Sequence, residues 1–399
     1  MGKSKRRLTM ALAVSGLSGL LHLAAMMAGP QPDIPDFARV RSDYQASEAV
    51  LLDRHGEVLH ELRVDPRARR LEWVRLSDIS PCLTRTVLFA EDRAFYRHRG
   101  VDLKAVAGAL LRKGRPRGAS TISMQVVPLL DRRLKPHGPR RSWPEKFRQI
   151  RAARALEKAW SKPQILEAYL NLVTFRGELQ GLRAASRGIL GKEPSGINDR
   201  EALVLAALIP EPQAPLRRTV ARAKALGASL GIACGDGELM TLVRNTVGHP
   251  YRVRPGVALA PHVARMLLSQ NRRRVVSTLD KGLQAFVSET LARQVAALNA
   301  RNVHDGAALV VDNQRGDILA YAGNTGAGAS APLVDGIRAP RQAGSTLKPL
   351  LYELALEREV LTAASILDDS ALQIPTPTGL YIPEDYDQTY AGEVSVRTA

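Results

Sequence analysis

The pattern of apolar and polar residues begins with one long uncharged run near the amino terminus. Residues 8–28 contain no Asp, Glu, Lys or Arg, and four basic residues precede them. This run of 21 residues is long enough to cross the roughly 30 Å hydrocarbon core of a bilayer as a helix. The positive flank predicts a cytoplasmic tail over residues 1–7, a transmembrane helix over 8–28 and export of the rest. A cleaved signal peptide is the alternative, because the run contains small-residue cleavage sites such as Ala28.

Shorter patterns after this run predict a hairpin and then a series of helices. Two apolar runs around a polar turn that ends in Gly56 predict a β-hairpin over 50–59. Helical periodicity then dominates from Leu76 to about Leu230. One of these helices is expected to begin near Pro144, because proline is favoured in the first turn of a helix.

In the carboxy-terminal third of the chain the pattern changes from helical to mixed helix and strand. Prolines 250, 255 and 261 interrupt the helical pattern, and two short apolar runs at 307–312 and 317–321 predict a second hairpin. The expected fold class is therefore α+β and multidomain, with a mainly α domain followed by a domain of mixed class. The predicted segments are a linker over 29–47, a mainly α domain with its hairpin over 48–245, a linker over 246–273 and a second domain over 274–399.

Charge narrows the choice of partners. The chain of 399 residues carries a net charge of +18, and residues 131–158 hold ten Lys or Arg against three Asp or Glu. Such a block is typical of nucleic-acid binding, but aromatic residues make up only 5% of the chain, so base stacking has little support. A phosphate-bearing lipid or a membrane surface fits better. Cys82 and Cys234 establish neither a disulfide nor a metal site, and the eight His show no metal-ligand spacing.

The first stretch that carries candidate chemistry is residues 91–100. If this stretch is helical, Glu91, Phe95 and His98 lie on one face, with Phe95 pointing inward. Glu91 is then held at a fixed place, where its carboxylate could act as a general base. Taken alone, an acidic pair here is also typical of a solvated helix start.

The second stretch is residues 118–125. Gly118 permits a tight turn, and Ser120 or Thr121 can cap the helix that follows. We expect the backbone N–H groups at that helix end to point outward, where they would suit a phosphate. Taken alone, the two hydroxyls also fit a plain helix cap.

In this order the two stretches resemble a known family. Glu-Asp-x-x-Phe-x-x-His-x-Gly-x-Asp at 91–102 and Gly-x-Ser-Thr at 118–121 resemble the first two motifs of the family 51 peptidoglycan glycosyltransferases, the polymerase domain of class A penicillin-binding proteins. Met124 before Gln125 is similar to the penicillin-binding protein 1C branch. The resemblance continues at 161–171, 179–181, 190–192 and 201–205.

The resemblance implies a fold, a reaction and a set of residues. The domain would be mainly α and lysozyme-like, and it would polymerise lipid II into β-1,4 glycan strands with inversion and release of undecaprenyl pyrophosphate. By resemblance Glu91 takes the proton from the attacking sugar 4-hydroxyl, and Asp92 supports its field. The residues that match substrate contacts are Phe95, His98, Gly118, Ser120, Thr121, Gln125, Arg148 and Asn171.

The third family motif, Arg-Lys-x-x-Glu, falls on residues 145–149, and here the sequence departs from the pattern. Lys146 and Arg148 keep cations that could neutralise the leaving pyrophosphate. Gln149 replaces the carboxylate of the motif, and its amide can form hydrogen bonds but cannot ionise. The 1C branch resembles this sequence in having Gln there, so Lys146 and Gln149 are retained as candidate catalytic residues.

A second nucleophile motif lies further along the chain. Gly344-Ser345-Thr346-Leu347-Lys348 resembles the Ser-x-x-Lys motif of penicillin-binding transpeptidases, in which the Lys348 amine would lower the cost of deprotonating Ser345. The family's Ser-x-Asn and Lys-Thr-Gly motifs do not follow it. We therefore expect an incomplete α/β transpeptidase domain over 274–399 without transpeptidase activity.

The resemblance also implies partners and a location. We expect lipid II, the growing glycan strand, the membrane and other cell-wall synthesis proteins as partners, and no nucleic acid. A single-pass protein of the bacterial inner membrane with most of its chain in the periplasm is expected. The resemblance predicts no certain cofactor and leaves open a divalent cation, Mg²⁺ or Mn²⁺, that assists pyrophosphate departure. The alternative function is a non-catalytic cell-wall scaffold that binds lipid II or glycan.

Overall fold

The computed structural model describes residues 32–102, 120–135, 142–251, 253, 256–383 and 389–398. Contacts divide the chain into two compact units, Met1–Leu333 and Val334–Ala399. The predicted transmembrane helix over 8–28 lies outside the described residues, as does Gly118. Within the described ranges, no helix combines the length and the apolar character needed to cross a membrane.

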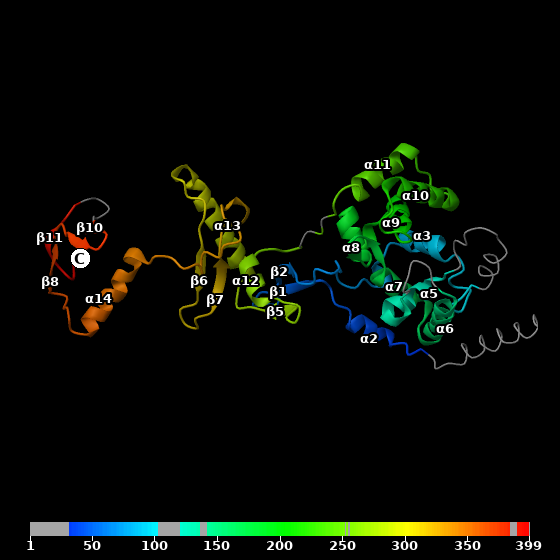
Figure 1. Ribbon diagram of the computed structural model, residues 1–399, viewed down its shortest axis with the longest axis horizontal. Coiled ribbons are helices and arrows are strands. Elements are labelled where there is room, and N and C mark those ends of the chain that lie inside the picture. The colour runs from blue at the N-terminus through cyan, green and yellow to red at the C-terminus, as the bar shows by residue number, and fades with distance from the viewer. Residues whose placement is uncertain are drawn as a thin grey trace, which may run out of the picture. The chain divides into compact units, whose positions relative to one another are not determined.

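The first unit is built around one buried helix. Every residue from Glu201 to Leu208 of helix α9 (Asp199–Leu208) is buried. A helix that is shielded on all sides needs neighbours on all sides. Helices α3 (Pro81–Glu91), α10 (Leu216–Leu230) and α11 (Asp236–Val247) pack against it, and Figure 1 shows them gathered around it.

A second group of helices carries most of the candidate site. Helix α5 (Ile122–Leu130) packs against both α6 (Trp143–Ala159) and α7 (Lys162–Leu172). Ser142 and Glu145 form a capping box at the start of α6, and Pro144 lies in its first turn. The predicted helix start near Pro144 is therefore confirmed. The remaining short elements of this region are α2 (Phe37–Ser42), β3 (Thr174–Arg176), β4 (Leu179–Gln180) and α8 (Leu182–Ala185).

Helix α3 ends earlier than the sequence predicts. Its last residue is Glu91, and the φ of Asp92 is −161°, which is outside the helical region. Residues 93–99 form turns instead of a continued helix. The condition under which Glu91, Phe95 and His98 would share a helical face is therefore not met, although Phe95 does point inward and is 1% exposed. Tertiary contacts explain the early end of the helix, because the Asp92 side chain forms hydrogen bonds with His98 and with the Ile122 N–H, which lie outside α3.

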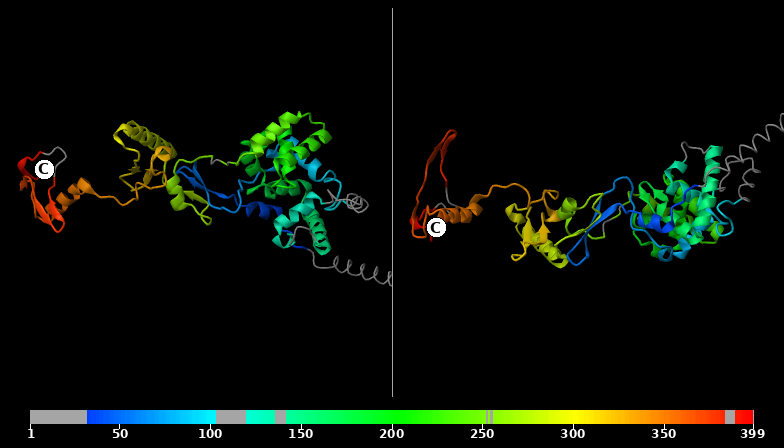
Figure 2. Two further views of the ribbon diagram at one scale, coloured as in Figure 1. Left: turned by 45° about the horizontal axis from the view of Figure 1, so that its top comes forward. Right: turned by 90° about the horizontal axis from the view of Figure 1, so that it is seen from below.

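A small sheet extends the first unit. Strands β1 (Glu48–Leu52) and β2 (Val58–Arg63) pair antiparallel, which confirms the predicted hairpin over 50–59. Strand β5 (Arg274–Val276) pairs parallel with β1, so the strand order is β2-β1-β5. Helix α12 (Pro261–Leu267), within the predicted linker over 246–273, packs on β2, and both views of Figure 2 show them together.

The last part of the first unit is a hairpin with one helix. Strands β6 (Ala308–Val311) and β7 (Ile318–Ala322) pair antiparallel, which confirms the second predicted hairpin. Helix α13 (Lys281–Ala297) packs on β7. The division predicted at 273/274 falls inside this unit, and the assignment of 274–399 to a transpeptidase domain stays a prediction.

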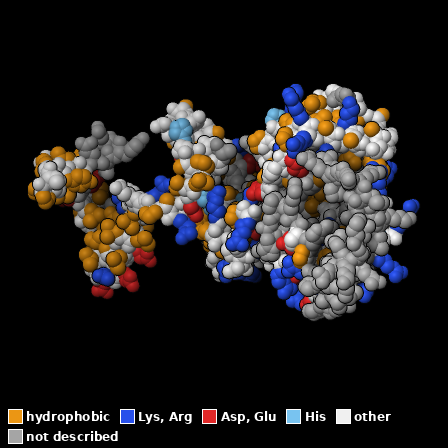
Figure 3. Space-filling model, turned by 45° about the vertical axis from the view of Figure 1, so that its right-hand side comes forward, with side chains coloured by type: hydrophobic (Ala, Val, Ile, Leu, Met, Phe, Trp, Pro, Cys, Tyr) orange, Lys and Arg blue, Asp and Glu red, His pale blue; other side chains and the backbone are white. Residues whose placement is uncertain are grey.

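The described residues of the second unit form one α-helix, which follows a short 3-10 helix at Gly344–Leu347, and two pairs of strands. These are α14 (Lys348–Glu357), β8 (Ile366–Asp369) paired with β11 (Gly392–Ser395), and β9 (Ile374–Thr376) paired with β10 (Gly379–Tyr381). None of its described residues is buried. Large apolar side chains such as Leu350 and Leu351 are more than half exposed, and Figure 3 shows hydrophobic side chains gathered on the surface of this unit.

Candidate active site

Three helices bring their side chains together at Glu91. Glu91 is the last residue of α3, and its Oε2 accepts a hydrogen bond of 2.9 Å from Gln125 Nε2 on α5. The Tyr169 hydroxyl on α7 donates in turn to Gln125 Oε1 at 3.0 Å. Burial raises the pKa of the Glu91 carboxyl above its ordinary value, and hydrogen bonding from Gln125 and Tyr169 opposes that rise. Glu91 is therefore a carboxylate with a raised pKa at a fixed place, as a general base requires.

The neighbouring carboxylate of Asp92 turns the other way, into the protein. Its Oδ2 accepts from the Ile122 backbone N–H at 2.9 Å and lies 2.9 Å from His98 Nε2. His98 Nδ1 accepts from the Gly100 N–H at 3.1 Å, so the ring proton belongs on Nε2, where it is donated to Asp92. Asp92 thus ties the end of α3 to the start of α5.

The start of α5 does not offer the anion site that the sequence suggests. Thr121 caps the helix, since its Oγ1 accepts from the Met124 N–H at 3.2 Å. The first helical N–H, that of Ile122, is taken by Asp92. The prediction that the N–H groups of this helix end point outward toward a phosphate is therefore wrong for Ile122 and Met124. The Thr121 hydroxyl itself donates to the Gly100 carbonyl at 2.7 Å.

A buried charge cluster lies behind His98. Glu157 on α6 is 3.8 Å from His98 Nδ1, and it accepts from Lys162 Nζ at 2.7 Å and from the Ser123 hydroxyl. Lys162 Nζ also lies 4.4 Å from the centroid of the Phe95 ring. The negative charge of Glu157 is thus satisfied within the protein, and it fixes α6 and α7 against α5.

The predicted pyrophosphate clamp is divided between two environments. Lys146 Nζ donates to Ser120 Oγ at 2.8 Å, while Arg148 is exposed. Gln149 is 1% exposed, and its Nε2 donates to the Met124 carbonyl. The structure therefore brings Lys146 and Ser120 together and uses Gln149 to join α6 to α5. The catalytic and substrate-binding roles of these residues stay predictions.

Two other predicted substrate contacts are buried. Phe95 is 1% exposed and belongs to the hydrophobic core. The Asn171 side chain accepts from the Val74 N–H at 2.9 Å and donates to the Val74 and Glu167 carbonyls at 2.8 Å each. Its polar atoms are thus directed to the backbone and not to Glu91, and the substrate role of both residues stays a prediction.

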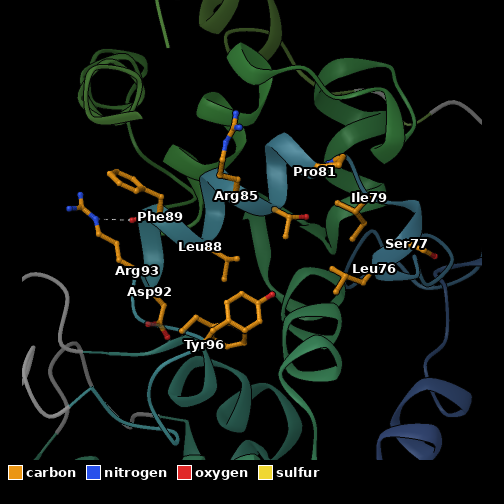
Figure 4. A pocket seen from close by; sticks show the side chains of 12 residues that line it. Leu76, Ser77, Ile79, Pro81, Arg85, Leu88, Phe89, Asp92, Arg93 and Tyr96 are labelled. Atoms are coloured by element: carbon orange, nitrogen blue, oxygen red, sulfur yellow. Dashed lines mark hydrogen bonds between the residues drawn. The ribbon is translucent and has the colours of Figure 1, made fainter. Parts of the chain in front are cut away.

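An apolar groove of about 660 Å³ runs along α3 beside Asp92. Figure 4 shows Leu76, Ile79, Leu88 and Tyr96 around this space, with the Arg93 side chain turned away to the Phe89 carbonyl. Because the groove is lined by Asp92 and not by Glu91, it borders the candidate base without containing it.

No metal site is evident in the described part of the chain. There, no three His, Cys, Asp or Glu side chains gather in a way that could hold an ion. The carboxylates of Asp92 and Glu157 are both engaged by protein donors. The assistance of Mg²⁺ or Mn²⁺ stays a prediction.

Comparison with known proteins places this site in a family. Residues 55–228 match the family described as transglycosylase. The chain is 36% identical over 180 residues to the biosynthetic peptidoglycan transglycosylase of Salmonella arizonae, a match that covers 44% of this chain and 68% of that protein. The chain belongs to the transglycosylase family. Glu91, Gln125, Tyr169 and the groups around them all lie inside the matched residues.

Longer relatives resemble this chain beyond the matched residues. Penicillin-binding protein 1C of Escherichia coli is 34% identical over 341 residues, which cover 82% of this chain and 42% of that protein. Penicillin-binding protein 2D of Bacillus subtilis is 29% identical over 357 residues, which cover 80% of this chain and 49% of that protein. The chain spans about half the length of these relatives or less. A crystal structure of penicillin-binding protein 1A from Haemophilus influenzae aligns with a TM-score of 0.45 at 15% identity, covering 89% of this chain and 59% of that one.

Sequence reasoning does not find three of the residues that build the candidate site. Tyr169 and Lys162 lie in the stretch 161–171 that resembles the family, but nothing in the local pattern gives them a role. Glu157 lies in a helix rich in Lys and Arg, where a charged residue is typical of a solvent-exposed surface. Their contacts join residues that are far apart in the sequence.

The second nucleophile motif belongs to the second unit. Ser345 and Lys348 are both exposed. In the described part of that unit, no hydrogen bond joins their side chains, and the role of Ser345 as a transpeptidase nucleophile stays a prediction.

Proposed function

We propose that this chain is a peptidoglycan glycosyltransferase that polymerises lipid II into β-1,4 glycan strands and releases undecaprenyl pyrophosphate. The observation that carries the proposal is the Glu91 carboxylate. It is mostly buried, Gln125 Nε2 holds its Oε2, and hydrogen bonding from Gln125 and Tyr169 favours its charged form. One carboxylate oxygen is thus fixed, and the proposal assigns the other, Oε1, to a substrate hydroxyl.

In the proposed reaction Glu91 Oε1 takes the proton from the 4-hydroxyl of one sugar. The freed oxygen attacks the anomeric carbon of the lipid-linked sugar from the side opposite the pyrophosphate, so the configuration inverts. The C–O bond to the pyrophosphate breaks, and that group departs with both bonding electrons. Lys146 and Arg148 supply positive charge as the negative charge of the leaving group develops.

The same proposal includes a setting for the enzyme. The likeness to penicillin-binding protein 1C over 82% of this chain supports membership of that branch. We place the enzyme in the bacterial inner membrane, anchored by residues 8–28, with the bulk of the chain in the periplasm. Its partners would be lipid II, the growing glycan strand and other cell-wall synthesis proteins.

The test replaces the proposed base. Glu91→Gln keeps the shape of the side chain and removes its basicity, so polymerisation should fall by about 10²- to 10⁴-fold. The measurement is the yield of glycan strands from fluorescent lipid II, separated on a gel. Glu72→Gln is the matched control, because Glu72 is about half exposed and lies 3.5 Å from Arg183 on the surface. The control should retain full activity.

Two results would overturn the proposal. If Glu91→Gln polymerises within threefold of the unmodified protein, Glu91 is not the base. If the unmodified protein binds lipid II but makes no glycan under any condition, the chain is a cell-wall scaffold and not an enzyme.

A further inference from the structure

A directed chain of hydrogen bonds leads from α7 to the Glu91 carboxylate. The Tyr169 hydroxyl donates to Gln125 Oε1 at 3.0 Å, and Gln125 Nε2 donates to Glu91 Oε2 at 2.9 Å. Tyr169 is 0% exposed, so water does not compete for its hydroxyl. Both donors point toward the carboxylate.

The direction of the chain depends on the Tyr169 hydroxyl. The side-chain amide of Gln125 has one donor end and one acceptor end, and it can be turned in two ways. A hydroxyl that donates to Oε1 selects the orientation in which Nε2 faces Glu91. In the other orientation Oε1 would face a carboxylate oxygen, which is also an acceptor. Burial and the negative charge of Glu91 raise the pKa of Tyr169, so its proton is retained for donation.

We infer that Tyr169 is a positioning residue that acts through Gln125: it fixes the amide so that Glu91 Oε2 is held and Oε1 is left for the substrate. The effect of Tyr169 on catalysis rests on the proposed function. Its effect on the orientation of Gln125 rests only on the hydrogen bonds.

The charged groups around Glu91 determine whether the loss of the Tyr169 hydroxyl raises or lowers the pKa of Glu91. Burial and the negative charge of Asp92, next in the chain, raise the pKa of Glu91. The bonds from Gln125 and Tyr169 and the positive charge of Arg222 on α10 lower it. Removing the Tyr169 hydroxyl therefore removes a contribution that lowers the pKa, and the pKa of Glu91 should rise. As the pH falls, a carboxylate with a higher pKa takes up its proton, and stops acting as a base, at a higher pH.

The first experiment measures kcat/KM for glycan synthesis against pH in Tyr169→Phe. The acidic limb of the profile should move to higher pH by about half a unit to one unit, which lowers kcat/KM on that limb by about three- to tenfold. Activity well above the limb should change much less. In a Gln125→Met background, Tyr169→Phe should produce a smaller shift than it does alone, because the connecting amide is gone and only the direct hydrogen bonding between Tyr169 and Glu91 remains.

Tyr44→Phe is the matched control. Tyr44 is also largely buried, and its hydroxyl donates to the Leu71 carbonyl at 2.9 Å, a contact that does not involve Glu91. Both variants lose a mostly buried tyrosine hydroxyl. Only Tyr169→Phe should move the acidic limb, so a general loss of stability is separated from a change at Glu91.

The second experiment does not require activity. A carbodiimide with an amine nucleophile modifies protonated carboxyl groups, and peptide mass spectrometry gives the extent of Glu91 modification at each pH. The midpoint of this curve should rise in Tyr169→Phe and stay unchanged in Tyr44→Phe. Equal curves for Tyr169→Phe and the unmodified protein would overturn the inference. A raised midpoint in a protein that makes no glycan would support the positioning role while refuting the proposed function.

Discussion

Replacing Asp92 with alanine removes the acceptor of two donors inside the protein. The Ile122 N–H and His98 Nε2 both lie 2.9 Å from Asp92 Oδ2. His98 cannot escape by moving its proton to the other nitrogen, because Nδ1 already accepts from the Gly100 N–H. Each buried donor left without a partner costs about 1–3 kcal/mol. We therefore expect Asp92→Ala to lower the free energy of unfolding by about 2–6 kcal/mol.

Asp92→Asn provides the comparison that isolates this effect. An amide oxygen in the position of Oδ2 can still accept from both donors, so the variant loses the additional strength of a charged acceptor. That difference is about 1 kcal/mol for each bond, or about 2 kcal/mol in total. The variant also places an N–H donor at the position of Oδ1, 3.1 Å from the protonated Nε2 of His98. Alanine should therefore be more destabilising than asparagine at this position, by up to about 4 kcal/mol.

The assay is urea-induced unfolding followed by tryptophan fluorescence. The three tryptophans of the chain all lie between residues 73 and 160, so the signal reports the transglycosylase region. The free energy of unfolding of a small domain falls by about 1–3 kcal/mol for each molar of urea. The loss expected for Asp92→Ala should therefore lower the midpoint of unfolding by about 1 M or more. Asp199→Ala is the surface control, because its pair with Arg85 is largely exposed and should contribute less than about 1 kcal/mol.

The reasoning is refuted if Asp92→Ala and Asp92→Asn unfold at the same urea concentration. That result would mean that the Ile122 and His98 donors find other partners, and that Asp92 does not hold α3 to α5. Destabilisation by Asp199→Ala of the same size as by Asp92→Ala would instead show that the assay does not separate buried from exposed contacts.

Three further predictions concern the other candidate residues. Lys146→Ala should lower kcat more than it raises KM if this cation neutralises the leaving pyrophosphate, and an effect on KM alone would exclude that role. Gln149→Glu should lower the free energy of unfolding by about 1–3 kcal/mol in the urea assay, because a carboxylate cannot donate to the Met124 carbonyl; unchanged stability would contradict the tie between α5 and α6. Ser345 and Lys348 are exposed, so no stable labelling by a fluorescent penicillin is expected; labelling that Ser345→Ala abolishes would show a functional nucleophile.

Several elements of the fold follow from the sequence because their signals are local. The two hairpins depend on short apolar runs around polar turns, and both form where the pattern predicts them. The start of α6 depends on Ser142, Pro144 and Glu145, which are neighbours in the chain. The family motifs also identify Glu91 and Gln125 as members of one site, because the chemistry is encoded in residue types at fixed spacing.

The tertiary structure decides which of those residues touch and in which direction. The sequence allows a helix through His98, but hydrogen bonds from the Ile122 N–H and from His98 to the Asp92 side chain compete with helix continuation, and α3 ends at Glu91. Tyr169 lies 44 residues from its partner Gln125, so no local pattern could reveal the bond between them. Local propensity is weak and depends on nearest neighbours, whereas a buried donor or acceptor must find a partner wherever the fold provides one. The residue types of this site are thus set by the sequence, and their hydrogen-bond partners are set by the packing of α3, α5 and α7.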